Sequence, residues 1–464
     1  MIRRTVHYSP KHTSRSASAR ADSFAAGPTA RVPSRRGSHV VNLLDIIYCL
    51  VVVGTAPWWA RKKRTGWRER FGHVGQVPPR SRRPRVMIHA VSVGEVNALR
   101  PLIPLLLDRF DLVVSASTDT GIARARALFA EHCTIVRYPL DLSRSVARFL
   151  DAVQPDLVAL VELEVWPNFV TACARRSIPV AVINGRLSER SFRGYRKIRF
   201  ALRRTFASLS LVGAQDEIYR KRFIAMGVVP DRCKVTGSMK WDAVDLSRAS
   251  QAPTEPALRL AEEMGIDPTR PLIVAGSTAP GEEALIHRAC PPGVQLLCAP
   301  RHPPRFDQAA ADLPGCVRRS ARRPGPPGTD RFLLDTIGEL SAAYELADLV
   351  VIGRSFTPQR GSDPTEPVAL GKPVVVGPSM ENFESITQVL ERAGAIVRTL
   401  PDDLAEVLSS LLSDPHRRHD LATRGVECVR TQQGASAQHA ELIAALLARA
   451  PENTPIRSDA AGAR

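Results

Sequence analysis

The residues of this chain that could do chemistry lie in short polar segments that follow predicted strands. In the first half, Ser92-Val93-Gly94-Glu95 opens a helix after one strand, and Glu162 and Glu164 stand at the end of another. Ligands of open α/β sheets bind outside the carboxyl ends of the strands. A carboxylate at such an end can act as a general base, so Glu95 is a candidate base. Lys240, in the turn Gly237-Ser238-Met239-Lys240, is a candidate contact for an anion.

Each of these residues also has a structural interpretation. Ser92 and Glu95 fit the S-x-x-E capping box, in which the carboxylate caps a helix. Glu162 and Glu164 are two residues apart, so they share a face if the strand continues. A turn between them would direct one to the site and let the other brace a neighbouring arginine. A solvated surface lysine is the commoner interpretation of Lys240.

The second half of the chain carries a matching set of polar strand ends. Gly276-Ser277-Thr278 precedes a helix that opens at Gly281-Glu282-Glu283, where backbone amides could receive an anion. Pro300-Arg301-His302-Pro303 ends the next expected strand. Arg301 could pair bidentately with a phosphate or a carboxylate, whereas a lone histidine such as His302 is more often structural.

Two further segments open helices after strands, namely Gly338-Glu339 and Asp363-Pro364-Thr365-Glu366-Pro367. The second would place amides toward a phosphate and Glu366 toward a ribose diol. The chain has no GxGxxG and no GxxxxGK[ST] motif, so neither dinucleotide redox chemistry nor P-loop hydrolysis is supported. Two α/β halves, each with its own polar strand ends, predict a cleft enzyme that holds two substrates face to face.

The elements that must position these residues follow from an alternation of strands and helices, which predicts a parallel sheet in each half. The strands expected in the first half are 86–89, 112–115, 156–161, 180–183 and 209–212, with helices at 95–107 and 120–130. Those expected in the second half are 272–275, 295–299, 332–335, 349–352 and 373–376, and a helix at 435–448 closes the chain. Residues 243–270 are helical but poor in strand signal, which predicts a connector, and residues 319–330 read as an exposed loop.

The positive charge of the chain is concentrated at its amino-terminal end. Of the formal net charge of +18, residues 1–85 carry +15, from 18 Lys and Arg against three acidic residues, so the other 379 residues carry about +3. The expected folded body is therefore close to neutral and gives no electrostatic case for binding nucleic acid. Residues 1–39 are rich in Ser, Arg, Ala and Pro, which predicts a disordered basic tail, a transit peptide, or translation assigned from too early a start codon.

The longest apolar run of the chain predicts a membrane anchor. It spans 40–60, ends at Pro57-Trp58-Trp59, and is followed by the cluster Arg61-Lys62-Lys63-Arg64. Paired tryptophans followed by a basic cluster are typical of a helix that ends at a cytoplasmic headgroup layer. Asp45 would cost a few kcal/mol if it reached the bilayer core. An uncleaved anchor that spans the membrane or lies in its interface is therefore favoured over an ordinary buried helix.

The eight cysteines are scattered, with no CxxC pair and no spacing typical of metal ligands. This pattern predicts reduced, buried thiols in a cytoplasmic protein. A disulfide framework and a zinc site are both disfavoured.

Taken in order, these segments resemble the 3-deoxy-D-manno-octulosonic acid (Kdo) transferases of Gram-negative lipid A assembly. The resemblance covers about residues 43–448, and the many ordered matches make it specific although each alone is weak. Its carriers are His89–Glu95, Val161–Asn168, Asn184–Ser191, Val235–Asp242, Ala275–Thr278, Pro300–Phe306, Asp335–Leu340 and Asp363–Pro373.

The resemblance implies a GT-B fold, with two Rossmann-like domains facing across a cleft and an N-terminal membrane-anchoring helix. The implied divisions are a tail at 1–39, an anchor and its basic flank at 40–64, an acceptor domain at 65–242, a linker at 243–270, a donor domain at 271–450 and a disordered tail at 451–464. The implied location is the cytoplasmic face of the inner membrane, with a single N-terminal anchor.

The resemblance also implies an activity: inverting transfer of Kdo from CMP-Kdo to the glucosamine 6-hydroxyl of a lipid A precursor, lipid IVA, in lipopolysaccharide core biosynthesis. Partners are the donor, the acceptor and membrane lipids, with no nucleic acid, no cofactor and no metal. Glu95 is implied as the general base, with Glu162, Glu164 and Lys240 as catalytic residues that stabilise the transition state. The implied donor-binding residues are Ser277, Pro300, Arg301, His302, Ile337, Gly338, Glu339, Asp363, Pro364, Thr365 and Glu366.

The chain departs from the family pattern at one place, where Arg360-Gly361-Ser362-Asp363 stands for the usual Gly-Gly-His-Asn. Loss of the histidine and gain of an aspartate near a phosphate site are unfavourable unless Arg360 compensates. The alternatives are therefore a GT-B enzyme that uses a different nucleotide sugar and a catalytically silent scaffold at the membrane. A nucleic-acid-binding protein is a third class that rests on the isoelectric point alone.

Overall fold

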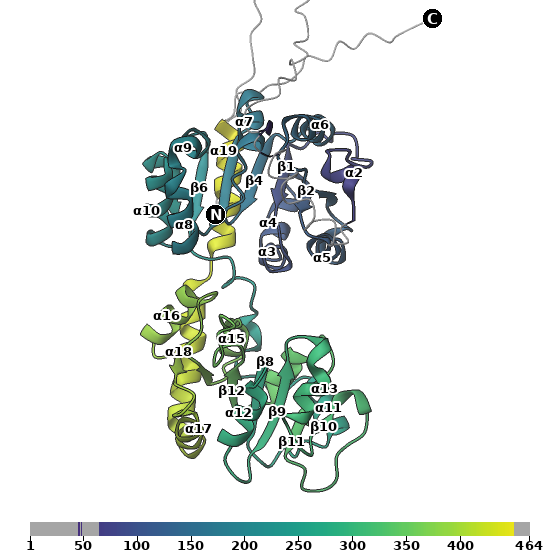
Figure 1. Ribbon diagram of the computed structural model, residues 1–464, viewed down its shortest axis with the longest axis vertical. Helices are drawn as coiled ribbons and strands as arrows, with labels where there is room; N and C mark the ends of the chain where they lie inside the picture. Colours follow the sequence, from purple (N-terminus) through teal and green to yellow (C-terminus); the bar gives the residue numbers. More distant parts are fainter. Residues whose placement is uncertain (1–44, 47, 49–64, 450–464) are drawn as a thin grey trace, which may run out of the picture. The chain divides into compact units, whose positions relative to one another are not determined.

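The computed structural model describes residues 45–46, 48 and 65–449, which form two parallel β-sheets with helices on both faces (Figure 1). The first sheet has the strand order β3-β2-β1-β4-β5-β6-β7. Its strands are β1 (Arg85–His89), β2 (Asp111–Ala116), β3 (Thr134–Arg137), β4 (Leu157–Val161), β5 (Val180–Gly185), β6 (Leu211–Ala214) and β7 (Cys233–Val235).

The second sheet repeats this arrangement with the order β10-β11-β9-β8-β12-β13-β14. Its strands are β8 (Leu272–Thr278), β9 (Gln295–Pro300), β10 (Val317–Arg318), β11 (Arg331–Leu333), β12 (Leu349–Ile352), β13 (Val374–Val376) and β14 (Ile396–Arg398). Each order reverses beside the first strand of its sheet, β1 or β8, and a crevice at such a switch point is where ligands bind in open α/β sheets.

Helices connect the strands of both sheets. Those that follow strands of the first sheet are α3 (Val93–Ala98), α4 (Leu102–Leu107), α5 (Asp119–Phe129), α6 (Ser143–Val153), α7 (Pro167–Arg175), α8 (Glu189–Lys197), α9 (Arg199–Ala207) and α10 (Glu217–Met226), and the short α2 (Trp67–Arg70) precedes them. Those of the second part of the chain are α11 (Glu255–Met264), α12 (Glu282–Ala289), α13 (Phe306–Ala311), α14 (Leu340–Leu346), α15 (Thr365–Ala369), α16 (Glu384–Arg392), α17 (Leu404–Ser413), α18 (Pro415–Gln432) and α19 (Ala435–Arg449).

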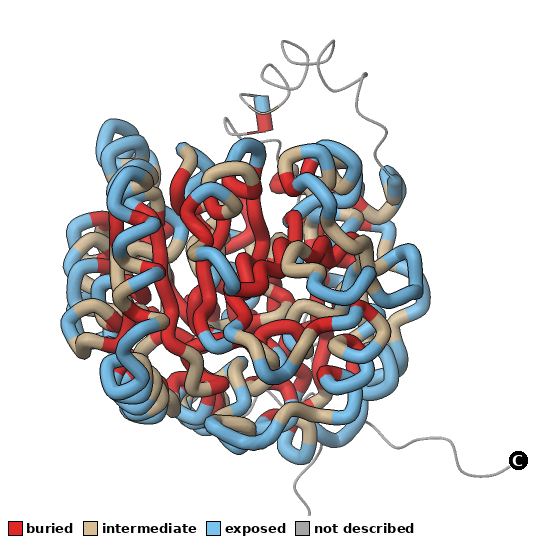
Figure 2. Tube along the Cα trace, turned by 90° about the horizontal axis from the view of Figure 1, so that it is seen from below, coloured by how far each residue is buried: buried red, intermediate tan, exposed pale blue. Residues whose placement is uncertain are grey.

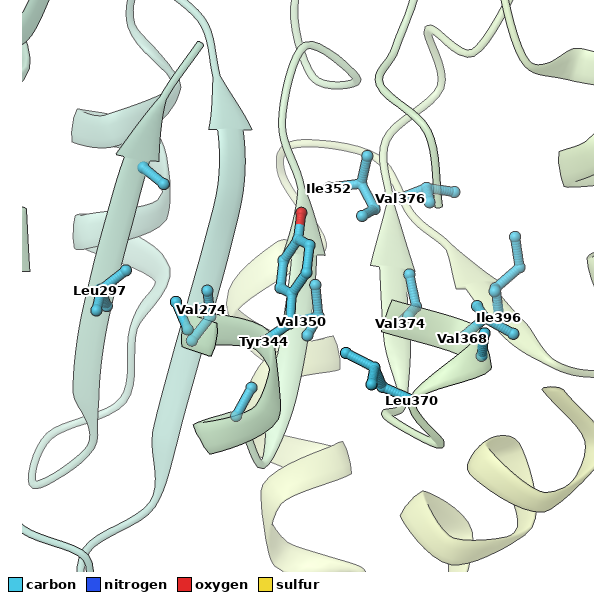
Figure 3. Close-up of a cluster of buried hydrophobic side chains, with 14 of the residues drawn as sticks. Val274, Leu297, Tyr344, Val350, Ile352, Val368, Leu370, Val374, Val376 and Ile396 are labelled. Atoms are coloured by element: carbon cyan, nitrogen blue, oxygen red, sulfur yellow. The ribbon is translucent and has the colours of Figure 1, made fainter. Parts of the chain in front are cut away.

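The central strands form the core because they are apolar on both faces. The strands β1, β4 and β12 are buried at every position, and Figure 2 shows such buried strand segments between helices with exposed outer surfaces. Near-continuous runs of Val, Ile and Leu are typical of parallel strands covered on both sides. Figure 3 shows one face of the second sheet, where Val274, Val350 and Val374 lie side by side on the neighbouring strands β8, β12 and β13.

The expected pattern of strands and helices is largely observed, with two kinds of difference. The helix expected at 95–107 is two helices, α3 and α4, because Pro101 follows the end of α3 and cannot donate the hydrogen bond that would continue it. The edge strands β3, β7, β10 and β14 were not expected. Each has only two to four residues, too few to show an alternating or continuous apolar pattern.

The last helix packs against the first sheet, although it follows the second sheet in sequence. Ala440 and Ile443 of α19 are buried in one core cluster with Val86 and Val161 of the first sheet (Figure 1). The expected donor domain of 271–450 is therefore wrong at its carboxyl end, because the apolar face of α19 is complementary to α4, β4 and β5.

Most of the predicted anchor at 40–64 lies outside the described residues, which include only Asp45, Ile46 and Tyr48 of that segment. Asp45 is buried and accepts hydrogen bonds from Ser143 N (2.8 Å) and Asn168 Nδ2 (3.1 Å). It is therefore held against the protein rather than in a bilayer core. Across 45–46, 48 and 65–449, no helix is both long enough and apolar enough to span a membrane.

Candidate functional site

The candidate base Glu95 lies in the first turn of α3, at the carboxyl end of β1. Its two carboxylate oxygens accept hydrogen bonds from Val91 N (2.9 Å) and from the Ser92 hydroxyl (2.9 Å). The Ser92 hydroxyl in turn caps the amide of Glu95 (3.5 Å). The structural interpretation is thus observed: Ser92 and Glu95 cap the helix reciprocally.

The pKa of Glu95 is raised although the residue caps the helix. Burial, and next the nearby charge of Glu162, raise the pKa of Glu95 to about 7, against the lowering effect of its two hydrogen bonds. Glu164 contributes in the same direction. The structure therefore brings the three candidate carboxylates close together, and a carboxylate with a pKa near neutrality is suited to general-base work.

Glu162 and Glu164 do not share the face of a strand, because β4 ends at Val161. Glu162 has a left-handed backbone (φ 59°), which is rare for a residue other than glycine and is often found at functional sites. Its carboxylate faces Arg186, 3.9 Å away, while that of Glu164 accepts a hydrogen bond from Trp166 Nε1 (2.8 Å). The pKa of Glu164 is also raised, by burial, although the Trp166 hydrogen bond opposes the shift.

Lys240 is half-buried in a turn after β7. Its ammonium lies 4.8 Å from the centroid of the Phe383 ring, and it forms no ion pair with any carboxylate of the described residues. The neighbouring Met239 and Trp241 are both buried, which fixes the backbone on either side of the lysine. Lys240 is thus a cation that remains available to an anionic ligand.

At the carboxyl end of β8, the expected anion position is occupied by the protein itself. Glu282, the first residue of α12, is fully buried and accepts hydrogen bonds from Ala279 N (2.8 Å) and Phe356 N (2.9 Å). It also accepts one from Arg354 N (2.5 Å), so one carboxylate ties together the turns that follow β8 and β12. Ser277, next to the last residue of β8, has a left-handed backbone (φ 59°).

The structure brings three predicted donor residues together around Tyr344 of α14. Burial, and then the charges of Glu366 and Asp363, raise the pKa of the buried Tyr344, while Arg301 lowers it. The hydroxyl points toward the carboxyl ends of the strands (Figure 3) and fills the space that a Cβ on Gly276 would need, 1.9 Å away. Arg301, Asp363 and Glu366 themselves are exposed and so accessible to a ligand.

The remaining predicted donor-binding residues differ in how accessible they are to a ligand. His302 and Ile337 are exposed, and Gly338 has a left-handed backbone (φ 98°), as a tight approach to a ligand or turn requires. Pro300 is buried within β9. Glu339 is engaged by Arg319 (2.8 Å); burial works to raise its pKa, but the hydrogen bonds from Arg319 and Thr336 outweigh burial and lower it.

The run 363–366 leads into α15 through an Asx turn, in which Asp363 accepts hydrogen bonds from the residue two positions on. Asp363 Oδ1 accepts hydrogen bonds from Thr365 N (3.0 Å) and from the Thr365 hydroxyl (2.7 Å), and Pro364 and Thr365 are buried. Asn and Asp side chains both form this turn. The exchange of the family asparagine for Asp363 therefore preserves the local structure and adds a negative charge. Arg360 and Gly361 both have left-handed backbones just before it.

Sequence reasoning missed three residues that organise these sites, namely Glu282, Tyr344 and Asn184. Asn184, at the end of β5, has a left-handed backbone (φ 51°) and accepts a hydrogen bond from Met239 N at its side chain (3.0 Å). A signal was present for two of them. Glu282 stands in a helix N-terminal segment that was considered only for its amides, and Asn184 precedes Gly185 in an Asn-Gly turn.

Comparison with known proteins identifies the family. Residues 65–243 match the family described as 3-deoxy-D-manno-octulosonic-acid transferase (kdotransferase). The chain is 32% identical over 401 residues to the 3-deoxy-D-manno-octulosonic acid transferase of Haemophilus influenzae, covering 82% of this chain and 91% of that protein. It is 34% identical over 411 residues to the protein of the same name from Bordetella pertussis, covering 81% and 93%.

Among solved structures, Anabaena HepE in complex with UDP-glucose aligns with a TM-score of 0.56 at 16% identity, covering 78% of this chain and 99% of that one. At that identity the likeness concerns the fold alone, and it supports a GT-B-like α/β fold with two parallel sheets. The resemblance found in the sequence is confirmed by the relatives that are similar over most of their length. The chain belongs to the 3-deoxy-D-manno-octulosonic acid (Kdo) transferase family.

Proposed function

We propose that this protein transfers Kdo from CMP-Kdo to the 6-hydroxyl of a glucosamine in a lipid A precursor such as lipid IVA, in lipopolysaccharide core biosynthesis. The observation that carries the proposal is Glu95, whose pKa is raised to about 7 beside Glu162 and Glu164 at the carboxyl ends of β1 and β4, in a chain of this family. A base that titrates near neutrality can take a proton from a sugar hydroxyl at the pH of a cell.

In the proposed reaction, Glu95 accepts the proton of the acceptor hydroxyl. At the same time the oxygen of that hydroxyl forms a bond to the anomeric carbon of Kdo. The bond from that carbon to the CMP phosphate breaks, and its electron pair leaves with CMP. A single displacement of this kind inverts the anomeric centre. The route needs one base and no protein nucleophile, so no second carboxylate has to approach the sugar.

The cations and amides of the second sheet support the donor side of this proposal. Arg301 would pair with the phosphate of CMP, as guanidinium groups do with phosphates. The segment 363–366 and Gly338 would approach the nucleotide with backbone amides. Lys240 would offset the negative charge that develops in the transition state, so positioning and charge stabilisation supply most of the barrier reduction without a metal.

The direct test is incubation of the full chain with a lipid A precursor and a system that generates CMP-Kdo, with products read by mass. A mass gain of one or more Kdo units is expected. Nucleotide binding tests the nearest alternative function. Tight binding of UDP and none of CMP would favour a GT-B enzyme with a different nucleotide sugar. Binding of CMP without any transfer would favour the silent scaffold.

The raised pKa of Glu95 predicts a pH dependence. The base must be ionised, so we expect kcat/KM to be constant above about pH 7 and to fall about tenfold per pH unit below it. Because the folded-state pKa lies above the usual value of 4.5, the stability contributed by Glu95 is full below that value and is lost as pH rises through about 7. A rate profile and a denaturation series across this range measure both trends, and a rate that is flat from pH 5 to 7 would contradict the role of Glu95.

We also propose that the protein works at the cytoplasmic face of the inner membrane. A surface on α8 and α9 supports this location independently of the predicted anchor. It consists of exposed cations around two exposed apolar side chains, Ile198 (47% exposed) and Phe200 (86%). The cations are Arg190, Arg193, Arg196, Lys197, Arg199, Arg203 and Arg204, and among the described residues only Arg193 has a carboxylate partner within 4 Å.

This α8–α9 surface combines the charge and the apolar anchors that favour an anionic lipid layer. Tyr195 of α8 also lies close enough to Tyr48 for the two phenol groups to interact electrostatically. Phosphatidylglycerol is the probe of choice, because it supplies the negative charge without resembling the acceptor.

Replacement of Arg199 and Arg203 by alanine is expected to weaken binding of the full chain to vesicles containing phosphatidylglycerol by about 2 kcal/mol, roughly 30-fold, since each surface cation contributes about 1 kcal/mol. Co-sedimentation with vesicles measures the change. The matched control replaces Arg417 and Arg424, two exposed arginines of α18, and should bind like the parent. Equal weakening in both variants would remove the support that the α8–α9 surface gives.

A further inference from the structure

A closed ring of hydrogen bonds joins α19 to the turn that carries Lys240. Asn184 accepts from Met239 N at Oδ1 (3.0 Å), and its own backbone amide donates to His439 Nε2 on α19 (3.0 Å). Asp242 closes the ring, because its two carboxylate oxygens accept from Gly434 N and Ser436 N (both 2.6 Å). Lys240 lies within this ring, between Met239 and Asp242.

His439 has one defined protonation state in the ring. Its Nε2 accepts from the Asn184 amide, so the proton of the neutral ring is on Nδ1. Burial lowers the pKa of His439 to about 4, which keeps the imidazole neutral near pH 7. The imidazole is packed directly on β6, where a Cβ on Gly213 would come within 2.4 Å of His439 Cε1. The imidazole is therefore a fixed acceptor rather than a titrating group.

The ring holds a backbone conformation that is unfavourable by itself. Gly237, within the Lys240 turn, has φ 81°, and Asn184, which accepts the Met239 amide from the end of β5, has φ 51°. The hydrogen-bonded ring thus includes two left-handed positions, one of them not a glycine. A left-handed non-glycine residue persists only where its surroundings hold it. His439 and Met239 supply that constraint from the two ends of the same asparagine.

The residues on each side of Lys240 are fixed by packing as well as by hydrogen bonds. Met239 belongs to the core of the first sheet and Trp241 to that of the second, and the Trp241 carbonyl accepts from Gln433 Nε2 (3.0 Å). Freedom at this turn is thus left mainly to the half-buried side chain of Lys240.

We propose that His439 is a positioning residue, which through Asn184 and Met239 fixes the backbone from which Lys240 presents its ammonium group to the reacting anion. The inference rests on the proposed function, in which Lys240 stabilises the transition state. It assigns α19 a part in the chemistry although none of its residues would touch a substrate.

The test compares His439→Leu with His439→Gln in the full chain. Glutamine keeps an acceptor for the Asn184 amide and leucine does not. The two variants are both uncharged and therefore differ in whether this hydrogen bond of the ring can form. We expect His439→Leu to lower kcat by about 10- to 10²-fold, the cost of a misplacement of about 1 Å, with the KM for CMP-Kdo unchanged. Glutamine should restore most of the loss.

Hydrogen exchange of the Met239 amide supplies a readout that does not depend on activity. Faster exchange of segment 236–242 in His439→Leu, reversed in His439→Gln, is expected even if the parent transfers no Kdo, which separates this inference from the proposed function. Asp242→Ala opens the ring at another point and should speed exchange in the same segment. Exchange and kcat equal to those of the parent in His439→Leu, or equal losses in the leucine and glutamine variants, would overturn the proposal.

Discussion

Replacement of Glu95 by glutamine is expected to lower the rate of Kdo transfer by about 10²- to 10⁴-fold, the usual contribution of a general base, while the protein stays folded. Glutamine serves as well as glutamate in a capping box. Its amide oxygen can accept from Val91 N, and its amide nitrogen can donate to the Ser92 hydroxyl, which reverses the second hydrogen bond. It cannot accept a proton at neutral pH. The substitution therefore removes the proposed chemistry and leaves the structural role of Glu95 in place.

The matched control for this variant is Ser92→Ala, which removes the cap and keeps the carboxylate. It should cost about 1 kcal/mol of stability. Because the Ser92 hydroxyl donates to Glu95 and lowers its pKa, its loss should move the inflection of the rate profile to higher pH. Single-turnover rates and thermal unfolding of both variants measure the two effects. Parental activity in Glu95→Gln would show that Glu95 only caps the helix.

The second large effect is expected from Glu282→Ala, which should destabilise the protein by about 3 kcal/mol or more. Three backbone amides, those of Ala279, Arg354 and Phe356, donate to this fully buried carboxylate, and each buried donor left without a partner costs about 1–3 kcal/mol. Since these amides belong to the turns after β8 and β12, the variant should also bind CMP more weakly. Denaturant unfolding and a CMP titration measure the two changes.

A matched control is available at the start of another helix. Glu255 is the first residue of α11, as Glu282 is of α12, but its side chain is 85% exposed and forms an ion pair with Arg259. Glu255→Ala should cost no more than about 1 kcal/mol, the value of an exposed ion pair with a favourable helix dipole. Similar losses in the two variants would mean that the hydrogen bonds of Glu282 do not stabilise the turns.

Much of this fold could be predicted from the sequence because its central strands are strongly apolar. The strands β1 and β12 are buried along their whole length, and continuous runs such as Leu349–Ile352 identify them. The capping segment at Ser92 and the helix openings at Gly281 and Gly338 were recognisable for the same reason, since each pairs a turn residue with the end of such a run.

The features that escaped prediction depend on contacts between distant parts of the chain. Nothing near Glu282 in the sequence shows that amides 72 and 74 residues away would donate to it. The left-handed backbones of Glu162 and Ser277 are equally hidden, because glutamate and serine give no local signal for them. The predicted domain boundary placed α19 with the second sheet. The sequence of an amphipathic helix shows which face is apolar but not which core that face packs against.

The position of α19 has a consequence for how this protein is made. Apolar residues between Val86 and Val161 form one core cluster with Ala440 and Ile443 of α19, which are synthesised much later. About 280 residues separate β4 from the middle of α19. At synthesis rates of about 5–20 residues per second, that cluster would stay incomplete for roughly 15 to 55 s. A nascent or prematurely terminated chain would thus expose an apolar surface to chaperones and proteases. Quality control of this enzyme should therefore act chiefly on products that lack α19.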